Sequence, residues 1–87
     1  MANSLFSLEL QKFILAKGSN NARLAKSMRR RGFGVTPQFI GQLILGVRPC
    51  PLERIDQIAQ TLELLAHEKE RLHRAAAIDA GFNIGRL

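Results

Sequence analysis

Apolar residues recur every three or four positions along five stretches of the chain, and glycine or proline separates most of these stretches. Such spacing is typical of amphipathic α-helices, because residues three and four apart share one helical face. No stretch alternates apolar and polar residues as a half-buried strand would. The pattern therefore predicts an all-α fold, a compact bundle of about four to five helices. The predicted helices cover residues 4–17, 21–31, 37–45, 52–64 and 66–80.

Residues that favour helix ends mark the limits of these stretches. Asn3 or Ser4 can cap the first helix, since a short polar side chain accepts hydrogen bonds from the free amides of the first turn. Thr36 followed by Pro37 is a strong start signal for the third helix. Gly81 predicts the end of the fifth helix and leaves the remaining residues as a short tail.

One side of each predicted helix is apolar and is expected to face a shared core. A chain of 87 residues has room for one domain with a small core. The expected core positions are Leu5, Phe6, Leu10, Phe13, Ile14, Leu24, Ala25, Met28, Ile40, Leu43, Ile44, Ile55, Ile58, Ala59, Leu62, Leu72, Ala75, Ala76 and Ile78.

Composition narrows the class of protein further. Apolar residues make up 46% and charged residues 23% of the chain, a balance typical of folded proteins rather than disordered ones. The single cysteine, Cys50, has no partner for an intrachain disulfide, and no run approaches the roughly 20 apolar residues of a membrane span. We therefore expect a cytoplasmic protein without a membrane segment.

Catalytic and metal-binding patterns are not found. His67 and His73 are the only imidazoles, and Arg71 stands where a zinc-protease motif would place its second histidine. No serine or cysteine has an identifiable general base, and no glycine-rich phosphate loop is present. The sequence predicts no enzyme activity, no metal, no cofactor and no small-molecule substrate.

Charge is distributed unevenly along the chain. The sequence holds 13 Lys and Arg against 7 Asp and Glu, for a net charge of +6. Residues 11–51 contain no Asp or Glu at all, and the eight basic residues of this segment are Lys12, Lys17, Arg23, Lys26, Arg29, Arg30, Arg31 and Arg48. A segment of one sign favours a polyanionic partner, because phosphates bind basic residues with release of counterions. Nucleic acid is the leading candidate.

Four local features follow one another in this basic segment and the next helix. They are the pair Leu24-Ala25, the run Val35-Thr36-Pro37-Gln38 before Ile40, Gly46 with Arg48-Pro49, and the apolar pattern Ile55, Ile58-Ala59, Leu62-Glu63-Leu64. In this order they resemble the helix-turn-helix domains of the lambda-repressor-like superfamily, which includes Cro and the phage repressors. The resemblance covers residues 5–65. The run SMRRRGFG after Ala25 is longer than the compact turn usual in the family, which leaves open how the two helices cross.

The resemblance implies that the helix over residues 37–45 enters the major groove of DNA. Gln38 and Gln42 are four residues apart and share a helical face, and a glutamine amide can pair with adenine through two hydrogen bonds. Gly41 beside them would permit close approach to the groove. The residues expected to contact bases are Thr36, Pro37, Gln38, Gly41 and Gln42.

Phosphate contacts are expected from basic side chains and from the amino end of the second helix. Arg48, directly after the third helix, is the strongest candidate among them. The arginines at residues 29–31 have an alternative explanation, since cations at a helix end also offset its dipole. The expected phosphate-binding residues are Asn20, Asn21, Lys26, Arg29, Arg30, Arg31 and Arg48.

The resemblance places the DNA-binding part at residues 1–65, with residues 66–87 as a C-terminal helix and tail of the same domain. Repressor-like domains generally bind two-fold sites as dimers, so we expect a homodimer through this helix. An alternative is that the helix only completes the core of its own chain. The residues expected at the dimer contact are Leu72, Ala75, Ala76, Ile78 and Phe82.

These observations predict a sequence-specific regulator of transcription that binds double-stranded DNA, a repressor of bacterial or phage type. One alternative is an antitoxin-like or adaptor module in which residues 37–45 contact a protein partner. Another is an RNA or single-strand binder that uses the arginines at 29–31. Stacking platforms for single strands are scarce, because the chain has five Phe and no Trp or Tyr. Phe39 is expected in the core, and the role of Phe33 is left open.

Overall fold

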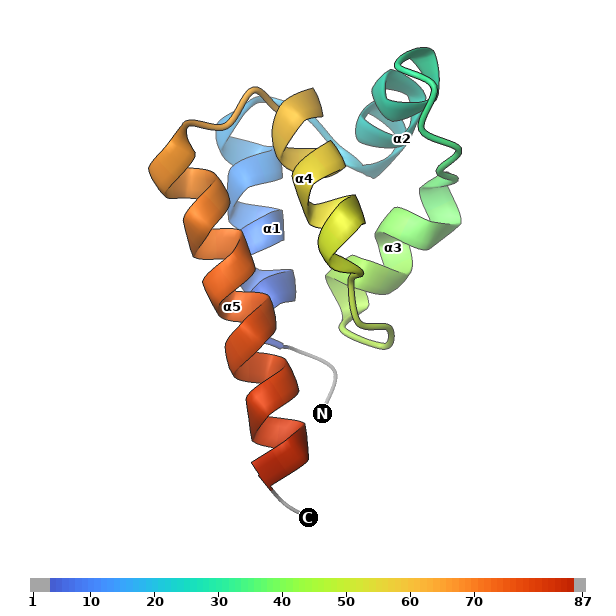
Figure 1. The fold of residues 1–87 in the computed structure, drawn as a ribbon. Helices are drawn as coiled ribbons and strands as arrows, with labels where there is room; N and C mark the ends of the chain where they lie inside the picture. Colours follow the sequence, from blue (N-terminus) through green and yellow to red (C-terminus); the bar gives the residue numbers. More distant parts are fainter. Residues whose placement is uncertain (1–3, 86–87) are drawn as a thin grey trace.

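The structure, a computed structural model, describes the backbone of residues 4–85 and the side chains of residues 4–80. The described residues form five helices and no strand, which confirms the predicted all-α class (Figure 1). The helices are α1 (Leu5–Ala16), α2 (Asn21–Arg30), α3 (Pro37–Leu45), α4 (Leu52–Thr61) and α5 (Ala66–Gly85).

The helices pack in two groups that share one core. Figure 1 shows α5 running antiparallel along α1 and α4, while α2 and α3 lie on the other side of α4. Helix α2 packs against both α3 and α4, and α1 packs against both α5 and α3. None of the helices in residues 4–85 combines the length and the apolar character needed to cross a bilayer.

Side-chain caps explain where the first three helices begin. The Ser4 hydroxyl accepts from the amide of Ser7, and the Ser7 hydroxyl accepts from the amide of Ser4, both at 3.0 Å, so the two serines form a capping box. Asn20 caps α2 and Thr36 caps α3, as the sequence predicted for Thr36. Helix α3 then ends at Gly46, whose φ of 74° lies in the left-handed region that glycine adopts without strain.

The predicted apolar faces form the observed core with few exceptions. Ile44 and Ala76 are partly buried, whereas the predictions for Leu5 and Ile78 were wrong, since these side chains are 46% and 49% exposed. Successive residues of a helix are rotated by about 100° around its axis. This rotation places Leu5 and Ile78 beside the stripe of their helix that faces the core, rather than within it. Two more apolar residues, Phe33 and Val35 in the turn before α3, contribute to the core.

Two predicted helix ends were also wrong. Helix α4 stops at Thr61 rather than residue 64, because Glu63 adopts a left-handed φ of 56°. There the Leu64 amide donates to the Ala59 carbonyl at 2.9 Å, the bond that closes a Schellman turn. Helix α5 continues through Gly81 to Gly85, since one interior glycine costs about 1 kcal/mol and each further residue adds a backbone hydrogen bond.

Helix α5 is fastened to α1 by polar contacts as well as by packing. The Asp79 carboxylate accepts hydrogen bonds from the amides of Leu5 and Phe6, at 3.1 and 3.0 Å. It thereby caps the start of α1 from 74 and 73 residues away. Arg71 donates to Glu9 at 3.3 Å. The C-terminal helix is therefore part of the same folded unit as residues 4–65.

Candidate nucleic-acid interface

Helix α3 is held by one face and presents the other to solvent. Ile40 and Leu43 are buried in the core, with exposed fractions of 0% and 1%. Gln38 and Gln42 are both exposed, and within residues 4–80 neither side-chain amide has a hydrogen-bond partner. Pro37 is exposed at the start of the helix and Gly41 is half-buried. The outward face of α3 therefore carries two amides that are available to a ligand.

Thr36 has a structural task in addition to its predicted base contact. Its Oγ1 accepts a hydrogen bond from the amide of Phe39 at 3.1 Å and so caps α3. A hydroxyl that accepts can still donate its own hydrogen, and the side chain is exposed. Thr36 can therefore cap the helix and donate to a ligand at the same time.

The long turn between α2 and α3, residues 31–36, has a defined course. Val35 is buried, and Phe33 is partly buried against the core with its amide donating to the Met28 carbonyl at 2.9 Å. The Arg29 guanidinium donates to the Val35 carbonyl at 3.4 Å, so this predicted phosphate contact also ties α2 to the turn. Phe33 is consequently a packing residue rather than an exposed platform for base stacking.

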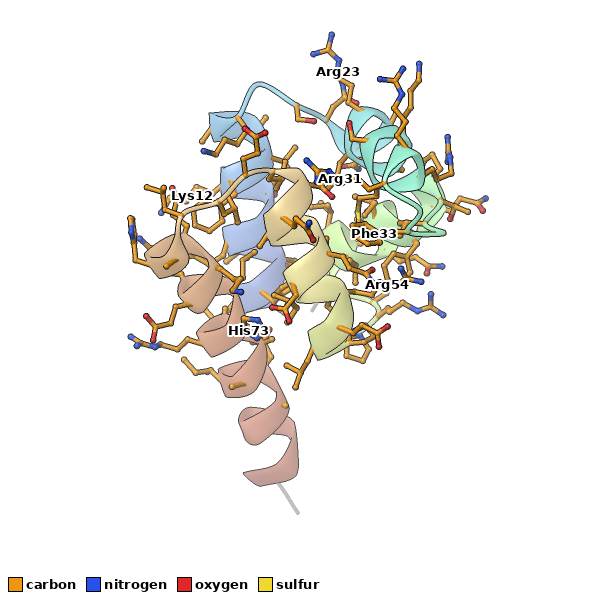
Figure 2. All side chains as sticks on the ribbon, turned by 45° about the horizontal axis from the view of Figure 1, so that its top comes forward. Lys12, Arg23, Arg31, Phe33, Arg54 and His73 are labelled. Atoms are coloured by element: carbon orange, nitrogen blue, oxygen red, sulfur yellow. The ribbon has the colours of Figure 1, made fainter. Side chains whose placement is uncertain are left out.

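The remaining predicted phosphate contacts of α2 are open to solvent. Lys26, Arg30 and Arg31 are exposed, and within the described residues none has a carboxylate in ion-pair range. Asn20 is exposed at the amino end of the helix, where its Oδ1 accepts from the Arg23 amide at 2.9 Å and its amide hydrogens stay free to donate. Figure 2 shows the Arg23 side chain extending away from the body of the molecule on this side.

Asn21 is half-buried at the edge of a surface hollow. The hollow has a volume of about 370 Å³ and lies between the end of α1, the start of α2 and Ile44 of α3. Asn20 and Asn21 both line it. These two predicted phosphate contacts therefore share a concave surface, separate from the exposed face that carries Gln38 and Gln42.

Arg48 is exposed in the connection after α3, and the structure places beside it a residue that the sequence did not reveal. The Cζ of Arg48 lies 5.4 Å from the centre of the Phe39 ring, and the Cζ of Arg54 lies 5.9 Å from the same centre. Phe39 itself is half-buried and packs against the core, as expected. Sequence reasoning missed Arg54 because the three residues of this cluster come from separate elements. Phe39 lies on α3, Arg48 in the proline-containing connection and Arg54 on α4.

Ion pairs among residues 4–80 join α5 to its neighbours α1 and α4. The described residues hold two, Lys69–Asp56 at 3.8 Å and Arg71–Glu9 at 3.3 Å, and a hydrogen bond of 2.7 Å joins His73 Nε2 to the same Asp56 carboxylate. Each uses a residue of α5, and Figure 2 shows His73 at the boundary between α5 and α4. None involves the eight basic residues of the segment 11–51, so no carboxylate among the described residues is paired directly with them.

Part of the predicted dimer contact was wrong. Leu72 is fully buried and Ala75 is 5% exposed, so both belong to the core of their own chain. Ala76 is partly buried and Ile78 is half-exposed. The Phe82 side chain lies outside the described residues. Of the predicted dimer residues whose side chains are described, Ile78 is the one that remains largely exposed to a partner.

Cys50 and the histidines do not form a reactive centre. Burial raises the pKa of the Cys50 thiol to about 12, while the nearby Arg54 charge opposes that rise. A thiol that stays protonated at neutral pH is a poor nucleophile. Among the described residues, no three His, Cys, Asp or Glu side chains lie close enough together to hold a metal ion.

No protein-family model, curated protein or solved structure matches this chain.

Proposed function

We propose that this chain is a sequence-specific DNA-binding regulator in which α2, the turn at 31–36 and α3 act as a helix-turn-helix of the lambda-repressor-like kind. One observation carries the proposal: α3 exposes the amides of Gln38 and Gln42, while Arg29 at the turn before α3 and Arg48 over the Phe39 ring form no ion pair among the described residues. Amides can specify bases in the major groove, whereas cations supply sequence-independent affinity for phosphates. The combination suits duplex DNA better than either feature alone.

In the proposed complex, α3 lies in the major groove with its amino end toward the bases. Gln38 and Gln42 pair with base edges, and Thr36 donates its hydroxyl hydrogen. Gly41 lies on the same helix, and a Cβ added there would meet no atom within 4 Å other than those of its chain neighbours and of the adjacent backbone of α3. The fold itself therefore does not require glycine at this position, which supports a role in close approach to DNA.

The protein acts as a homodimer and a repressor of bacterial or phage type, in the cytoplasm and on the nucleoid when bound. A two-fold dimer would place two copies of α3 in successive major grooves, about one helical turn apart. Because Leu72 and Ala75 are used by the core, the dimer contact has to involve exposed residues such as Ile78. Dimerisation would also set the protein concentration at which the site is occupied.

Selection from a randomised duplex pool, at low and near-physiological salt, tests the proposal. We expect one palindromic motif that survives the higher salt. Gln38→Ala and Gln42→Ala should each lose about 1 to 3 kcal/mol of preference for that motif and retain non-specific binding. Gln60→Ala is the matched control, because Gln60 is also exposed but lies on α4. Unchanged specificity in both α3 variants would contradict the assignment of α3 to the groove.

A protein-interaction module, antitoxin-like or adaptor, is the second candidate. Apolar side chains around the α3–α4 connection favour it, since Leu45, Val47 and Leu52 are 58%, 65% and 66% exposed. Exposed apolar residues that gather in one region often mark a contact with another protein. Selection that enriches no duplex motif, with binding lost steeply as salt rises, would favour this candidate. A preference for stem-loop or single-stranded RNA would instead indicate the third class.

A further inference from the structure

Two arginines from different elements converge on one aromatic ring beside α3. The Cζ atoms of Arg48 and Arg54 lie 5.4 and 5.9 Å from the centre of the Phe39 ring, within the range of cation–π attraction. Phe39 packs against the core, so the ring is a fixed support. Figure 2 shows Arg54 on the side of the molecule where α3 lies.

The charges of this pair are not neutralised within the chain. Among the described residues, no carboxylate lies within ion-pair distance of either guanidinium. Arg54 has a neutral neighbour instead, since its Nη1 donates to Gln57 Oε1 at 2.7 Å. Helix α4 carries two acids: Glu53 forms no ion pair among the described residues, and Asp56 is engaged by His73 and Lys69. Two cations held near one ring repel each other, and an anion that contacts both would relieve that repulsion.

The ring also leaves the guanidinium groups able to bind. A cation–π contact uses the face of the ring and consumes no N–H donor, whereas a salt bridge would occupy the donors. Each guanidinium has five N–H donors in a planar fork, which matches the oxygens of a phosphate group. Holding both side chains in place before binding lowers the conformational entropy lost on association.

We infer that Arg48 and Arg54 form a clamp for one phosphodiester group of the DNA backbone, and that Phe39 is the positioning residue for both. This inference rests on the proposed function and deepens it. Phe39 follows Gln38 directly in α3, so a phosphate in the clamp would fix the depth and register of the base-contacting face. The clamp adds Arg54 and Phe39 to the interface.

The experiment measures the dissociation constant for the selected duplex and for a random duplex over a range of salt concentrations. Arg48→Gln and Arg54→Gln should each weaken binding about tenfold and flatten the salt dependence by about one unit of log–log slope. The affinity of the double variant should fall by less than the product of the two single fold-changes, because both side chains hold the same phosphate. Arg74→Gln is the charge-matched control, since Arg74 is exposed on α5.

Phe39→Leu separates positioning from packing. It keeps an apolar side chain in the core but removes the ring, and it should weaken binding about threefold. In the Arg48→Gln, Arg54→Gln background it should have no effect, whereas a merely structural role would weaken binding in both backgrounds. Phe39→Tyr keeps the ring and should bind like the wild type. Circular dichroism and thermal unfolding establish that each variant is folded.

The outcomes distinguish the clamp from the proposed function. The clamp would be overturned if Arg54→Gln bound DNA as tightly as the control Arg74→Gln. It would also be overturned if Phe39→Leu weakened binding equally in both backgrounds. Either result would leave sequence-specific binding in place. A wild type that selects no motif but binds random duplex through Arg48 and Arg54 would keep the clamp and reject the specific regulator. Failure of the wild type to bind any duplex at low salt would overturn both.

Discussion

The side of the molecule built on α5 and the side built on α2 and α3 use their charged residues in different ways. On the α5 side, carboxylates are paired within the chain: Glu9 with Arg71, Asp56 with His73 and Lys69, and Asp79 with the first amides of α1. On the α2–α3 side, residues 18–51 contain six basic residues and no acid, and none of the six forms an ion pair among the described residues.

This difference separates stability from binding. A charge that has an intrachain partner contributes to folding and is occupied, whereas an unpaired exposed charge contributes little to folding and remains available to a ligand. Substitutions of the paired charges on the α5 side should therefore change the free energy of unfolding and leave DNA binding intact. Substitutions of the unpaired basic residues on the α2–α3 side should do the reverse.

The largest effect is expected from Leu72→Ala. Leu72 is fully buried, and removing its side chain should lower the free energy of unfolding by about 2 to 5 kcal/mol through lost burial and a residual cavity. Chemical denaturation measures this change. Ile78→Ala, on the same helix but half-exposed, should cost clearly less. Equal costs at the two positions would mean that α5 does not belong to the core as described.

Asp79→Ala tests the cap that α5 supplies to α1. The amides of Leu5 and Phe6 would lose their carboxylate acceptor, and we expect a loss of about 1 to 2 kcal/mol in the free energy of unfolding. Glu70→Ala is the control, because Glu70 is exposed on the same helix. Should Asp79→Ala reduce affinity for DNA at unchanged stability, the division between the two sides would not hold.

Gly41→Ala should move stability and binding in opposite directions. Alanine fits the chain without a contact closer than 4 Å and should stabilise α3 by about 1 kcal/mol. The added methyl group would stand between α3 and the groove, so affinity for the selected duplex should fall. Ala77→Gly on the exposed part of α5 is the converse control, with lower stability and unchanged binding. Tighter binding by Gly41→Ala would remove Gly41 from the interface.

The contribution of Asp56 should depend on pH. Hydrogen bonding to His73, followed by the His73 and Lys69 charges, holds the pKa of the Asp56 carboxyl below its ordinary value of 3.8. A lowered carboxyl pKa stabilises the fold above the unfolded-state pKa, and that stabilisation is lost as pH falls through the folded-state pKa. Asp56→Asn should therefore cost about 0.5 kcal/mol at pH 7 and nothing at pH 2. A cost that persists at pH 2 would point to packing instead.

The smallest change in stability is expected for Lys26→Gln combined with Arg30→Gln. Both side chains are exposed on α2, so the free energy of unfolding should stay within about 0.5 kcal/mol of the wild type. The log–log slope of binding against salt should nevertheless fall by about two. Arg71→Gln reverses this pattern, since it leaves the partly buried Glu9 without its cation. A large loss of stability in the α2 variant would show that these charges act within the fold.

Most of the fold could be predicted because its determinants are local. The caps at Ser4 and Thr36, the start at Pro37 and the three- and four-residue spacing of apolar side chains each act within one or two helical turns. The errors in the ends of α4 and α5 have local causes too, but each cause changes the free energy of the helix only slightly. Glu63 takes a left-handed conformation that sequence rarely signals, and α5 tolerates a glycine that was expected to stop it.

The candidate interface could be predicted only in part. The exposed positions of Gln38 and Gln42 follow from the apolar period of α3, which assigns Ile40 and Leu43 to the core. Helical period alone could not separate Leu72, which the core consumes, from Ile78, which stays half-exposed, because both belong to a broad apolar stripe. Which part of such a stripe is covered depends on how the neighbouring helices cross it.

The sequence by itself determined the five helices, most of their buried faces and the one-sided distribution of positive charge. Only the tertiary structure decided which distant side chains meet. The convergence of Arg48 and Arg54 on Phe39, and the cap that Asp79 places on α1, join residues from separate elements. Spacing along a helix fixes neighbours three and four residues apart, whereas contacts between helices depend on packing angles that no local pattern contains.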